Sequence, residues 1–330
     1  MLDMLKMNEV RWGIIGCGDV TEVKSGPAFN KVSGSRLVAV MRRNAEKASD
    51  YAQRHQVPKW YSDADELIND PDVNAVYVAT PPNAHEVYTI RSLEAGKPVY
   101  VEKPMAKNTA ECQKMVEKSE EKGIPLFVAY YRRALPYFLK VKELVDSGII
   151  GDVKLVNMRL FWPPKPGEQD GNAGWRVDPA ISGGGHFHDL ASHQFDYLEF
   201  LLGPVKRAVG IGINQSSLYT ADDAISASFT FESGIIGSGL WCFTVPDSKE
   251  EEFAEITGSK GRLTFSFFSN NKIRIETEDK SEEYEIPHPQ HVQQPLIEQV
   301  VNELLGNGQC SSTGKTGLRA TWIMDSILRS

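Results

Sequence analysis

Residues 10–130 alternate short apolar runs with amphipathic stretches, and this alternation restricts the fold more than any other feature of the sequence. Five runs have the length and composition of strands: 10–15, 36–41, 75–79, 99–101 and 126–129. Three intervening stretches have helical periodicity: 45–55, 84–95 and 109–122. Short strands that are apolar on both faces belong to a parallel sheet covered by helices. We therefore predict a doubly wound α/β domain over residues 1–130.

The ends of these helices carry local signals. Asn44 directly precedes the second helix, and Asn108, with Glu111 three residues later, resembles a capping box in which Asn replaces Ser or Thr. Gly96 and Gly123 stand where two of the helices are expected to end.

The pattern changes after Pro136. A helix over 137–147 is followed by a region rich in strands, and two helical patterns close the chain, at 295–305 and 317–328. The predicted strands are 153–161, 224–231, 235–243, 262–265 and 272–277, with a hairpin turn at 232–234. Consecutive strands without helices between them imply a mainly antiparallel sheet, so we predict an α+β domain over 131–330. The Pro- and Gly-rich stretch 163–174 is predicted to be a surface loop near a binding cleft.

Length and composition limit the class of protein. A chain of 330 residues suggests about two domains, and 41% hydrophobic with 24% charged residues is ordinary for a globular protein. The net charge of −8 argues against a general binder of nucleic acid or anionic membranes and favours a small-molecule partner. We expect no membrane span or signal peptide, and a cytoplasmic location. The cysteines are widely spaced, which predicts free thiols rather than disulfides or a zinc site: Cys17, Cys112, Cys242 and Cys310.

A Gly-x-Gly turn lies directly after the first strand and before a helix. Gly16 allows the tight turn, and Gly18 lets the backbone approach a pyrophosphate. The N–H groups at the start of the next helix, at Asp19 and Val20, would stabilise the phosphate charge. Thr21 stands where the third glycine of the pattern is usual, which leaves the packing of that helix in question. The spacing predicts a dinucleotide site.

The end of the second strand indicates which dinucleotide is bound. NAD sites usually place a carboxylate there, whereas this chain has Arg42 and Arg43. Two guanidinium groups match the 2′-phosphate of NADP through charge-assisted hydrogen bonds. We predict NADP(H) and keep NAD(H) as the alternative, since both arginines could instead be solvated at a helix start.

Three further segments follow strands at the sheet edge where ligands bind in such folds. Lys103 follows the 99–101 strand; desolvation beside a nicotinamide ring and a positive NADP⁺ neighbour would favour its neutral amine, which could hydrogen-bond the reacting oxygen. Its alternative roles are a salt bridge to Glu102 or a surface ammonium. The predicted cofactor contacts in these segments are Thr80, Pro81, Asn83, His85, Glu102, Lys103 and Arg132.

The run 183–196 combines three glycines with a helical pattern that continues through Leu202. Asp189, His193 and Asp196 are spaced i, i+4 and i+7 and therefore share one helix face. We predict that Asp189 binds substrate hydroxyls and that His193 exchanges the proton while hydride moves. His186 and His188 do not complete a familiar zinc spacing, so no metal site is predicted.

Other residues are expected to shape the substrate pocket. Tyr131 is predicted to contact substrate, and Arg176 is predicted to anchor substrate or cofactor. Trp175 either contacts substrate or packs in a loop. Residues 163–174 and 214–220 are predicted to line the pocket.

These motifs together resemble the Gfo/Idh/MocA oxidoreductase family over nearly the whole chain. The shared features are the 16–18 turn, Thr80-Pro81 with His85, Glu102-Lys103-Pro104, the 183–196 run, and 255–258 with Gly261. The resemblance implies a Rossmann domain joined to an α/β domain whose open, mainly antiparallel sheet often forms the subunit interface, hence a homodimer or homotetramer. It also implies that Lys103, Asp189 and His193 form the catalytic group. Within the family, Trp175-Arg176 and the arginine after the second strand look similar to NADPH-dependent sugar reductases of the 1,5-anhydrofructose reductase kind, and more distantly to dihydrodiol dehydrogenases.

The resulting prediction is an enzyme that transfers hydride between NADP(H) and a sugar, polyol or related cyclic carbonyl compound. Its central expectation is that Lys103 and His193, from different domains, act beside the nicotinamide. Two alternatives stay open: redox-neutral glycoside cleavage with tightly held NAD, and a cofactor-binding sensor without turnover.

Overall fold

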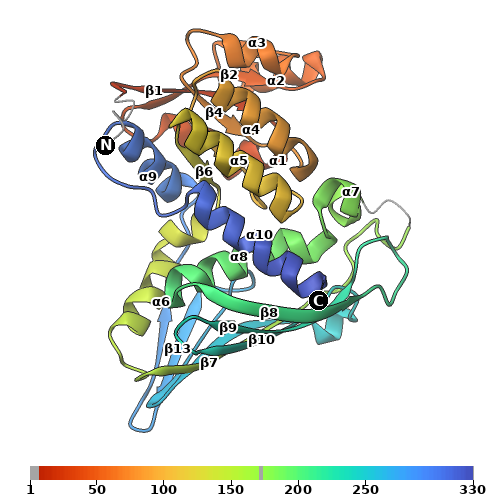
Figure 1. The fold of residues 1–330 in the computed structure, drawn as a ribbon, viewed down its shortest axis with the longest axis vertical. Helices are drawn as coiled ribbons and strands as arrows, with labels where there is room; N and C mark the ends of the chain where they lie inside the picture. The colour runs from red at the N-terminus through yellow and green to blue at the C-terminus, as the bar shows by residue number, and fades with distance from the viewer. Residues whose placement is uncertain (1–6, 171–173, 330) are drawn as a thin grey trace. The chain divides into compact units, whose positions relative to one another are not determined.

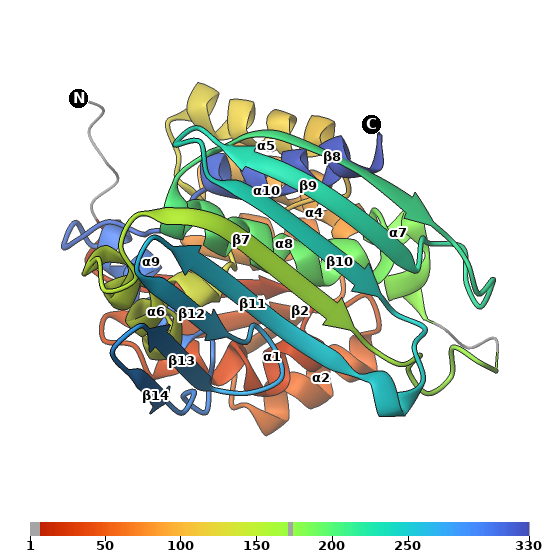
Figure 2. The same cartoon turned by 90° about the horizontal axis from the view of Figure 1, so that it is seen from below.

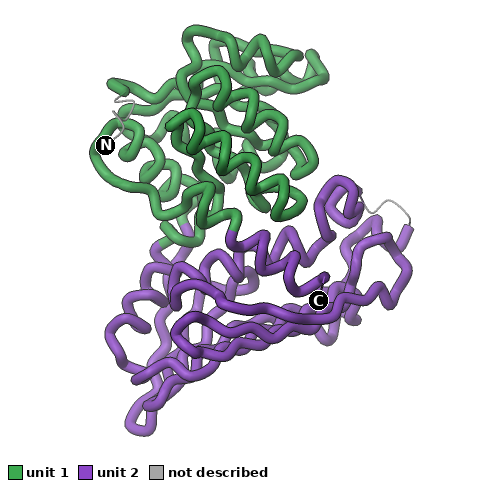
Figure 3. Tube along the Cα trace, in the orientation of Figure 1, with its two compact units in different colours: residues 1–135, 289–318 green, residues 136–288, 319–330 purple. Residues whose placement is uncertain are grey.

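The computed structural model describes residues 7–170 and 174–329 (Figure 1). It consists of two compact units (Figure 3). Unit 1 comprises residues 1–135 and 289–318, and unit 2 comprises residues 136–288 and 319–330. The predicted division at residue 130 differs from these units chiefly at 289–318, which we assigned to the second domain and which packs in unit 1. Among the described residues, no helix is both long and apolar enough to cross a membrane.

Unit 1 is built on a six-stranded parallel sheet with the order β3-β2-β1-β4-β5-β6. The strands are β1 Val10–Ile15, β2 Ser35–Met41, β3 Lys59–Tyr61, β4 Ala75–Val78, β5 Val99–Val101 and β6 Leu126–Val128. The order reverses between β1 and β4, the place where doubly wound sheets bind ligands. The predicted doubly wound fold is therefore confirmed. The three-residue β3 was not predicted, because none of its residues is buried and its apolar signal is weak.

The helices of unit 1 are α1 Asp19–Val23, α2 Ala45–Arg54, α3 Ala64–Asn69, α4 His85–Glu94, α5 Thr109–Lys122 and α9 Gln294–Leu304, with 3₁₀ turns η1 Gly26–Asn30, η2 Pro82–Ala84 and η3 Tyr131–Ala134. The four helices of unit 1 whose bounds we predicted, α2, α4, α5 and α9, begin and end within one residue of those bounds, whereas α3 was not predicted. The side chains of Asn44 and Asn108 accept hydrogen bonds from the backbone N–H groups of Lys47 and Glu111, as capping residues do. In a capping box the Glu111 side chain would accept from the backbone N–H of Asn108. Here it accepts instead from the N–H of Lys107, one residue earlier, at 3.2 Å.

The core of unit 1 explains why residues 289–318 belong to it. Trp12, Phe29, Tyr77 and Tyr100 form a chain of rings whose neighbouring centroids lie 4.9 to 6.4 Å apart. Helix α9 adds its apolar face to the same buried cluster: Leu296, Ile297, Val300, Val301 and Leu304. Burial of those side chains holds the segment on this unit.

Unit 2 is built on an eight-stranded sheet with the order β14-β13-β12-β11-β7-β10-β9-β8 (Figure 2). The strands are β7 Val153–Phe161, β8 Val205–Ile213, β9 Ala224–Phe231, β10 Ile236–Cys242, β11 Glu251–Gly258, β12 Gly261–Phe265, β13 Lys272–Thr277 and β14 Ser281–Glu285. All neighbours pair antiparallel except β7 with β10, so the predicted mainly antiparallel sheet is confirmed. The sequence did not predict β8, β11 or β14, whose polar or glycine residues dilute the apolar signal.

Helix α8 lies against one face of this sheet (Figure 2). The helical elements of unit 2 are α6 Pro136–Asp146, η4 Trp175–Val177, α7 Pro179–Ser182, α8 Gly185–Leu202 and η5 Asp247–Lys249, and α10 Gly314–Leu328 runs from unit 1 into unit 2. Trp241 of β10 is buried and donates its indole N–H to the side chain of Gln194 in α8, at 2.7 Å. Alternate residues of the strands are thus buried on the helix side, as the period of two requires.

The other face of the sheet carries exposed apolar side chains. We call it the open sheet face and define it by Leu155, Val209, Ile211, Ile213, Ile236 and Leu240, which are 37 to 66% exposed. They come from β7, β8 and β10, and Leu155 and Ile236 are paired neighbours in the sheet.

Candidate active site

The two glycines of the Gly-x-Gly turn, Gly16 and Gly18, differ in whether the chain's own packing requires glycine. Gly16 has φ +92°, and an added Cβ would lie 2.8 Å from Thr80 Cγ2 and 2.9 Å from the Thr80 nitrogen, so only glycine fits. Gly18 is extended, and an added Cβ would meet only the Gly16 carbonyl oxygen, at 3.8 Å. The packing of the chain itself does not require glycine at position 18. The space beside it fits the approach of a dinucleotide pyrophosphate.

Thr21, at the position of the usual third glycine, packs in α1 without disturbing the helix start. Its side chain is buried, and its hydroxyl donates to the carbonyl oxygen of Gly18 at 2.7 Å. The hydroxyl of Tyr51 in α2 donates to the Thr21 carbonyl oxygen at 2.9 Å. The close approach occurs instead at Gly26, where an added Cβ would clash with that carbonyl and with the Tyr51 hydroxyl.

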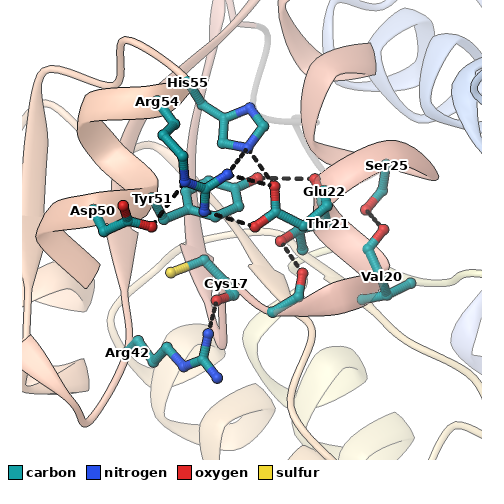
Figure 4. Close-up of polar contacts among 11 residues, drawn as sticks. Cys17, Val20, Thr21, Glu22, Ser25, Arg42, Asp50, Tyr51, Arg54 and His55 are labelled. Atoms are coloured by element: carbon teal, nitrogen blue, oxygen red, sulfur yellow. Dashed lines mark hydrogen bonds and ion pairs between the residues drawn. The ribbon is translucent and has the colours of Figure 1, made fainter. Parts of the chain in front are cut away.

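Arginine side chains near the turn differ in how their charge is matched (Figure 4). Arg54 donates to both carboxylate oxygens of Glu22, at 2.8 and 2.9 Å, and also pairs with Asp50. Hydrogen bonds from Arg54 and His55 hold the pKa of the Glu22 carboxyl at about 2. Arg42 is half-buried and donates to the neutral carbonyl oxygen of Cys17 at 3.3 Å, and no ion pair joins it to another described residue.

Arg43, beside Arg42, is exposed. Both guanidinium groups therefore follow the end of β2, where part of a dinucleotide ribose lies in folds of this kind. Asp19 is exposed and Val20 half-buried, at the start of the five-residue helix α1. None of the four cysteines, all within the described part of the chain, forms a disulfide.

Lys103 follows β5 and is attached to a buried hydrogen-bond network. Glu102 is only 6% exposed; its Oε1 accepts from the Tyr77 hydroxyl at 2.5 Å and from the Gln293 amide at 2.6 Å. Its Oε2 accepts from the Lys103 backbone N–H at 3.2 Å. The Tyr100 hydroxyl in turn donates to Gln293 Oε1 at 3.0 Å. Glu102 thus orients the start of the lysine loop. Sequence reasoning missed Gln293, because nothing local in its segment marks a partner 191 residues away.

The segment after β4 contains predicted cofactor residues with very different exposure. Asn83 is exposed in η2, and Thr80 and Pro81 are partly buried. His85, the first residue of α4, has no exposed surface, and both its ring nitrogens face backbone carbonyl oxygens. Its ring is therefore occupied by the protein's own backbone rather than open to a ligand.

The segment after β6 forms the short turn η3. Tyr131 is partly buried, and the Cζ atom of Arg132 lies 5.2 Å from the centroid of its ring. Arg132 is itself 6% exposed. The predicted substrate residue and the predicted cofactor residue thus stack on each other in unit 1.

In unit 2 the glycine run leads into α8, with Gly183 and Gly185 at positive φ. Asp189 is half-buried, whereas His193 is 2% and Asp196 1% exposed. The Nε atom of Arg176 lies 3.6 Å from Asp189 Oδ2, and its guanidinium stacks 4.5 Å from the Trp175 ring centroid.

The structure therefore brings three of the predicted substrate residues together, namely Trp175, Arg176 and Asp189. The His193 ring lies 6.4 Å from that of Phe268, between centroids.

A buried histidine–carboxylate hydrogen bond lies at the start of α8, and sequence reasoning missed it. Nε2 of His186 lies 2.7 Å from Oε1 of Glu168, and each side chain is 3% exposed. Burial, together with the charge of Lys165, lowers the pKa of His186, and Glu168 opposes this. Glu168 belongs to the stretch 163–174 that we predicted to be a surface loop. Residues 163–170 form no helix or strand and are mostly exposed or half-buried, and the buried side chain of Glu168 is the exception. The partner on α8 provides the burial, and residues 171–173 of that stretch lie outside the described part of the chain.

No group of three or more His, Cys, Asp or Glu side chains within 7–170 and 174–329 is arranged to hold a metal ion. His188 is buried, with Nε2 3.9 Å from Oδ1 of Asp325 in α10.

Comparisons with known proteins agree with this architecture. A family model described as "Oxidoreductase family, NAD-binding Rossmann fold" matches residues 10–130, and one described as "GFO/IDH/MocA C-terminal domain" matches residues 138–264. An oxidoreductase from Formosa agariphila is 39% identical, with 96% of this chain and 98% of that protein covered. A 1,5-anhydro-D-fructose reductase from Ensifer adhaerens is 27% identical, with 93% and 92% covered.

Among solved structures, a 3-ketoreductase from Actinomadura kijaniata in complex with NADP and TDP-benzene has a TM-score of 0.82 at 22% identity, with 97% of both chains covered. That similarity concerns the fold. The family models cover most of the sequence and both units, and the Formosa agariphila relative aligns over nearly the full length of both chains. The chain therefore belongs to the Gfo/Idh/MocA oxidoreductase family and is an NAD(P)-binding oxidoreductase.

Proposed function

We propose that this protein transfers hydride between NADP(H) and a sugar, polyol or related cyclic carbonyl compound. The observation that carries the proposal is Gly18, a glycine that the chain's own packing does not need, at the end of β1 and before α1. Relatives named 1,5-anhydro-D-fructose reductase and myo-inositol 2-dehydrogenase support the substrate class.

The turn and the two arginines would hold the dinucleotide. Gly16, Gly18 and the first N–H groups of α1 would contact the pyrophosphate, and Arg42 and Arg43 would bind a 2′-phosphate. Each charge-assisted hydrogen bond contributes about 1.5–3 kcal/mol before discounting for solvent exposure, so we expect a preference for NADPH of about one or two powers of ten. The arginines also disfavour an enzyme that recycles NAD without net redox change.

Three side chains would act on the substrate. The bound dinucleotide supplies or accepts the hydride. In the direction of reduction, Lys103 polarises the carbonyl oxygen and His193 donates the proton that this oxygen gains; in oxidation His193 removes it. Asp189, oriented by Arg176, accepts hydrogen bonds from neighbouring hydroxyls.

The cofactor preference is tested by measuring kcat/KM with NADPH and with NADH, at a fixed sugar or polyol substrate. Arg42→Ala should lower the NADPH value about tenfold or more and leave the NADH value nearly unchanged. Arg36→Ala, an exposed arginine earlier in β2, is the matched control and should change neither. Equal values for the two cofactors in the wild-type enzyme would contradict the preference.

The catalytic roles are tested with a panel of sugars and polyols followed by nicotinamide absorbance. Lys103→Met and His193→Asn should each lower kcat by about 10²–10⁴ while NADPH still binds. Lys107→Met, in an ion pair with Glu111, is the control for loss of a lysine. Near-normal turnover in both variants would overturn the assignment, and glycoside cleavage by protein with bound NAD, without net absorbance change, would establish the hydrolytic alternative.

We also propose that the open sheet face binds a second copy of this chain. Its six apolar side chains come from β7, β8 and β10, and the small polar residues Ser226 and Ser228 of β9 lie between β8 and β10. Contiguous exposed apolar surface of this kind marks protein interfaces. Ile211→Glu should shift the mass measured by light scattering to that of a monomer. Leu139→Glu, an equally apolar exposed residue on α6, should not; a wild-type monomer would contradict the proposal.

A further inference from the structure

His85 lies between two loops of the candidate site and contacts both through backbone atoms. Its Nδ1 lies 3.0 Å from the carbonyl oxygen of Pro104 and 3.2 Å from that of Met105. Its Nε2 lies 2.7 Å from the carbonyl oxygen of Thr80. One imidazole thus joins the loop after β4 to the loop after β5, within two residues of Lys103.

The ring is held in a site that accepts hydrogen bonds at both ends. A neutral imidazole donates at one nitrogen only, whereas an imidazolium donates at both. Burial lowers the pKa of His85, while the contacts with Thr80, Pro104 and Met105 and the nearby Glu102 carboxylate oppose that change. In either protonation state the ring fills the space between the loops and binds at least one of them.

We propose that His85 is a positioning residue for Lys103, acting through the backbone of Pro104 and Met105. The inference rests on the proposed role of Lys103. The lysine backbone is restrained from both sides, since its own N–H is bound by Glu102 and the next two carbonyls face His85. A lysine amine stands on a flexible four-carbon chain, so its position depends on a fixed backbone. Misplacement of a reacting group by about 1 Å can lower a rate about 10²-fold.

Burial separates this role from direct contact with a ligand. His85 has no exposed surface, so its side chain presents no atom to a ligand at the protein surface. Its effect on turnover would therefore have to pass through Lys103, which makes the two residues non-additive.

The test is a double-mutant cycle between His85 and Lys103. His85→Ala should lower kcat about 10- to 100-fold and leave the Kd for NADPH, measured by cofactor fluorescence, within about twofold. In the Lys103→Met background the same substitution should lower the residual kcat by no more than about twofold. His85→Gln keeps an N–H donor at this site and should recover part of the lost kcat.

The controls distinguish the ways in which the proposal could fail. Thr89→Val, at a fully buried threonine of the same helix, should leave kcat unchanged in both backgrounds. If His85→Ala does not fold, His85→Gln carries the same cycle. Normal turnover by Lys103→Met alone would overturn the proposed catalytic role of Lys103, on which this inference rests. An impaired Lys103→Met enzyme in which His85→Ala causes the full further loss would overturn only the role of His85, and a loss of NADPH binding with unchanged kcat would do the same.

Discussion

Replacing Gly18 by alanine separates what the fold needs from what a cofactor needs. Its φ of −135° and ψ of −158° are accessible to alanine, and the new Cβ would lie 3.8 Å from the Gly16 oxygen, an ordinary contact. The free energy of unfolding should therefore stay within about 0.5 kcal/mol of wild type, or rise slightly because the unfolded chain loses freedom. The added methyl group occupies the space proposed for the pyrophosphate, so NADPH should bind at least about tenfold more weakly, or by about 1.4 kcal/mol.

Gly16→Ala provides the contrast two residues earlier. The positive φ of +92° disfavours alanine by about 1–2 kcal/mol, and the Cβ would lie 2.9 and 3.0 Å from the Thr80 nitrogen and the Ala79 carbonyl carbon. These are backbone atoms that move only with β4, so we expect a total loss of about 2–4 kcal/mol and a Tm lower by about 5–10 °C.

The assay is thermal unfolding without cofactor, combined with titration by NADPH. The reasoning predicts that Gly18→Ala loses affinity and keeps its Tm, while Gly16→Ala loses Tm. Equal losses of Tm would show that the protein itself requires Gly18. Unchanged NADPH affinity in Gly18→Ala would show that the pyrophosphate lies elsewhere.

Two further predictions concern the buried and half-buried carboxylates of unit 1. The folded-state pKa of Glu22 is about 2, below its usual 4.5, so its pairing with Arg54 and His55 stabilises the fold above about pH 4.5, and this contribution is lost as the pH falls towards 2. Because the Glu22–Arg54 pair is partly exposed, Glu22→Gln should lower the free energy of unfolding, measured in urea, by only about 1 kcal/mol at neutral pH and by much less near pH 2. An equal loss at both pH values would contradict the link between the Glu22 pKa and stability. Gln293→Leu removes a hydrogen-bond donor to Glu102 and leaves the Tyr100 hydroxyl without its acceptor. The free energy of unfolding should therefore fall by about 2–3 kcal/mol, and kcat should fall while the affinity for NADPH stays unchanged. A wild-type kcat would show that Glu102 does not need this partner to hold the Lys103 loop.

Local sequence signals were sufficient to predict an element wherever its periodicity is visible within its own residues. The strands β1, β5, β7, β9 and β13 and the helix α5 have the predicted bounds, because a buried strand or an amphipathic helix shows its periodicity within its own residues. The Asn108 cap and the Gly16 turn were likewise predictable, since both depend on neighbours within a few positions. Strands such as β11 and β14 were missed because charged residues dilute their apolar signal, so their own residues show no clear periodicity.

Contacts between distant segments were decided only by the tertiary structure. Motif spacing singled out Glu102 and Lys103, yet Gln293, which holds Glu102, lies in a segment that the sequence assigned to the other domain. His85 was predicted to bind cofactor, and its burial between two backbone loops became visible only when β4 and β5 were placed side by side. The sequence alone determined the elements with a clear periodicity of their own and the motif residues that follow strands, because propensity and periodicity act over a few residues. The partners of those side chains follow from packing, which joins residues that are far apart in the chain and have no local pattern in common.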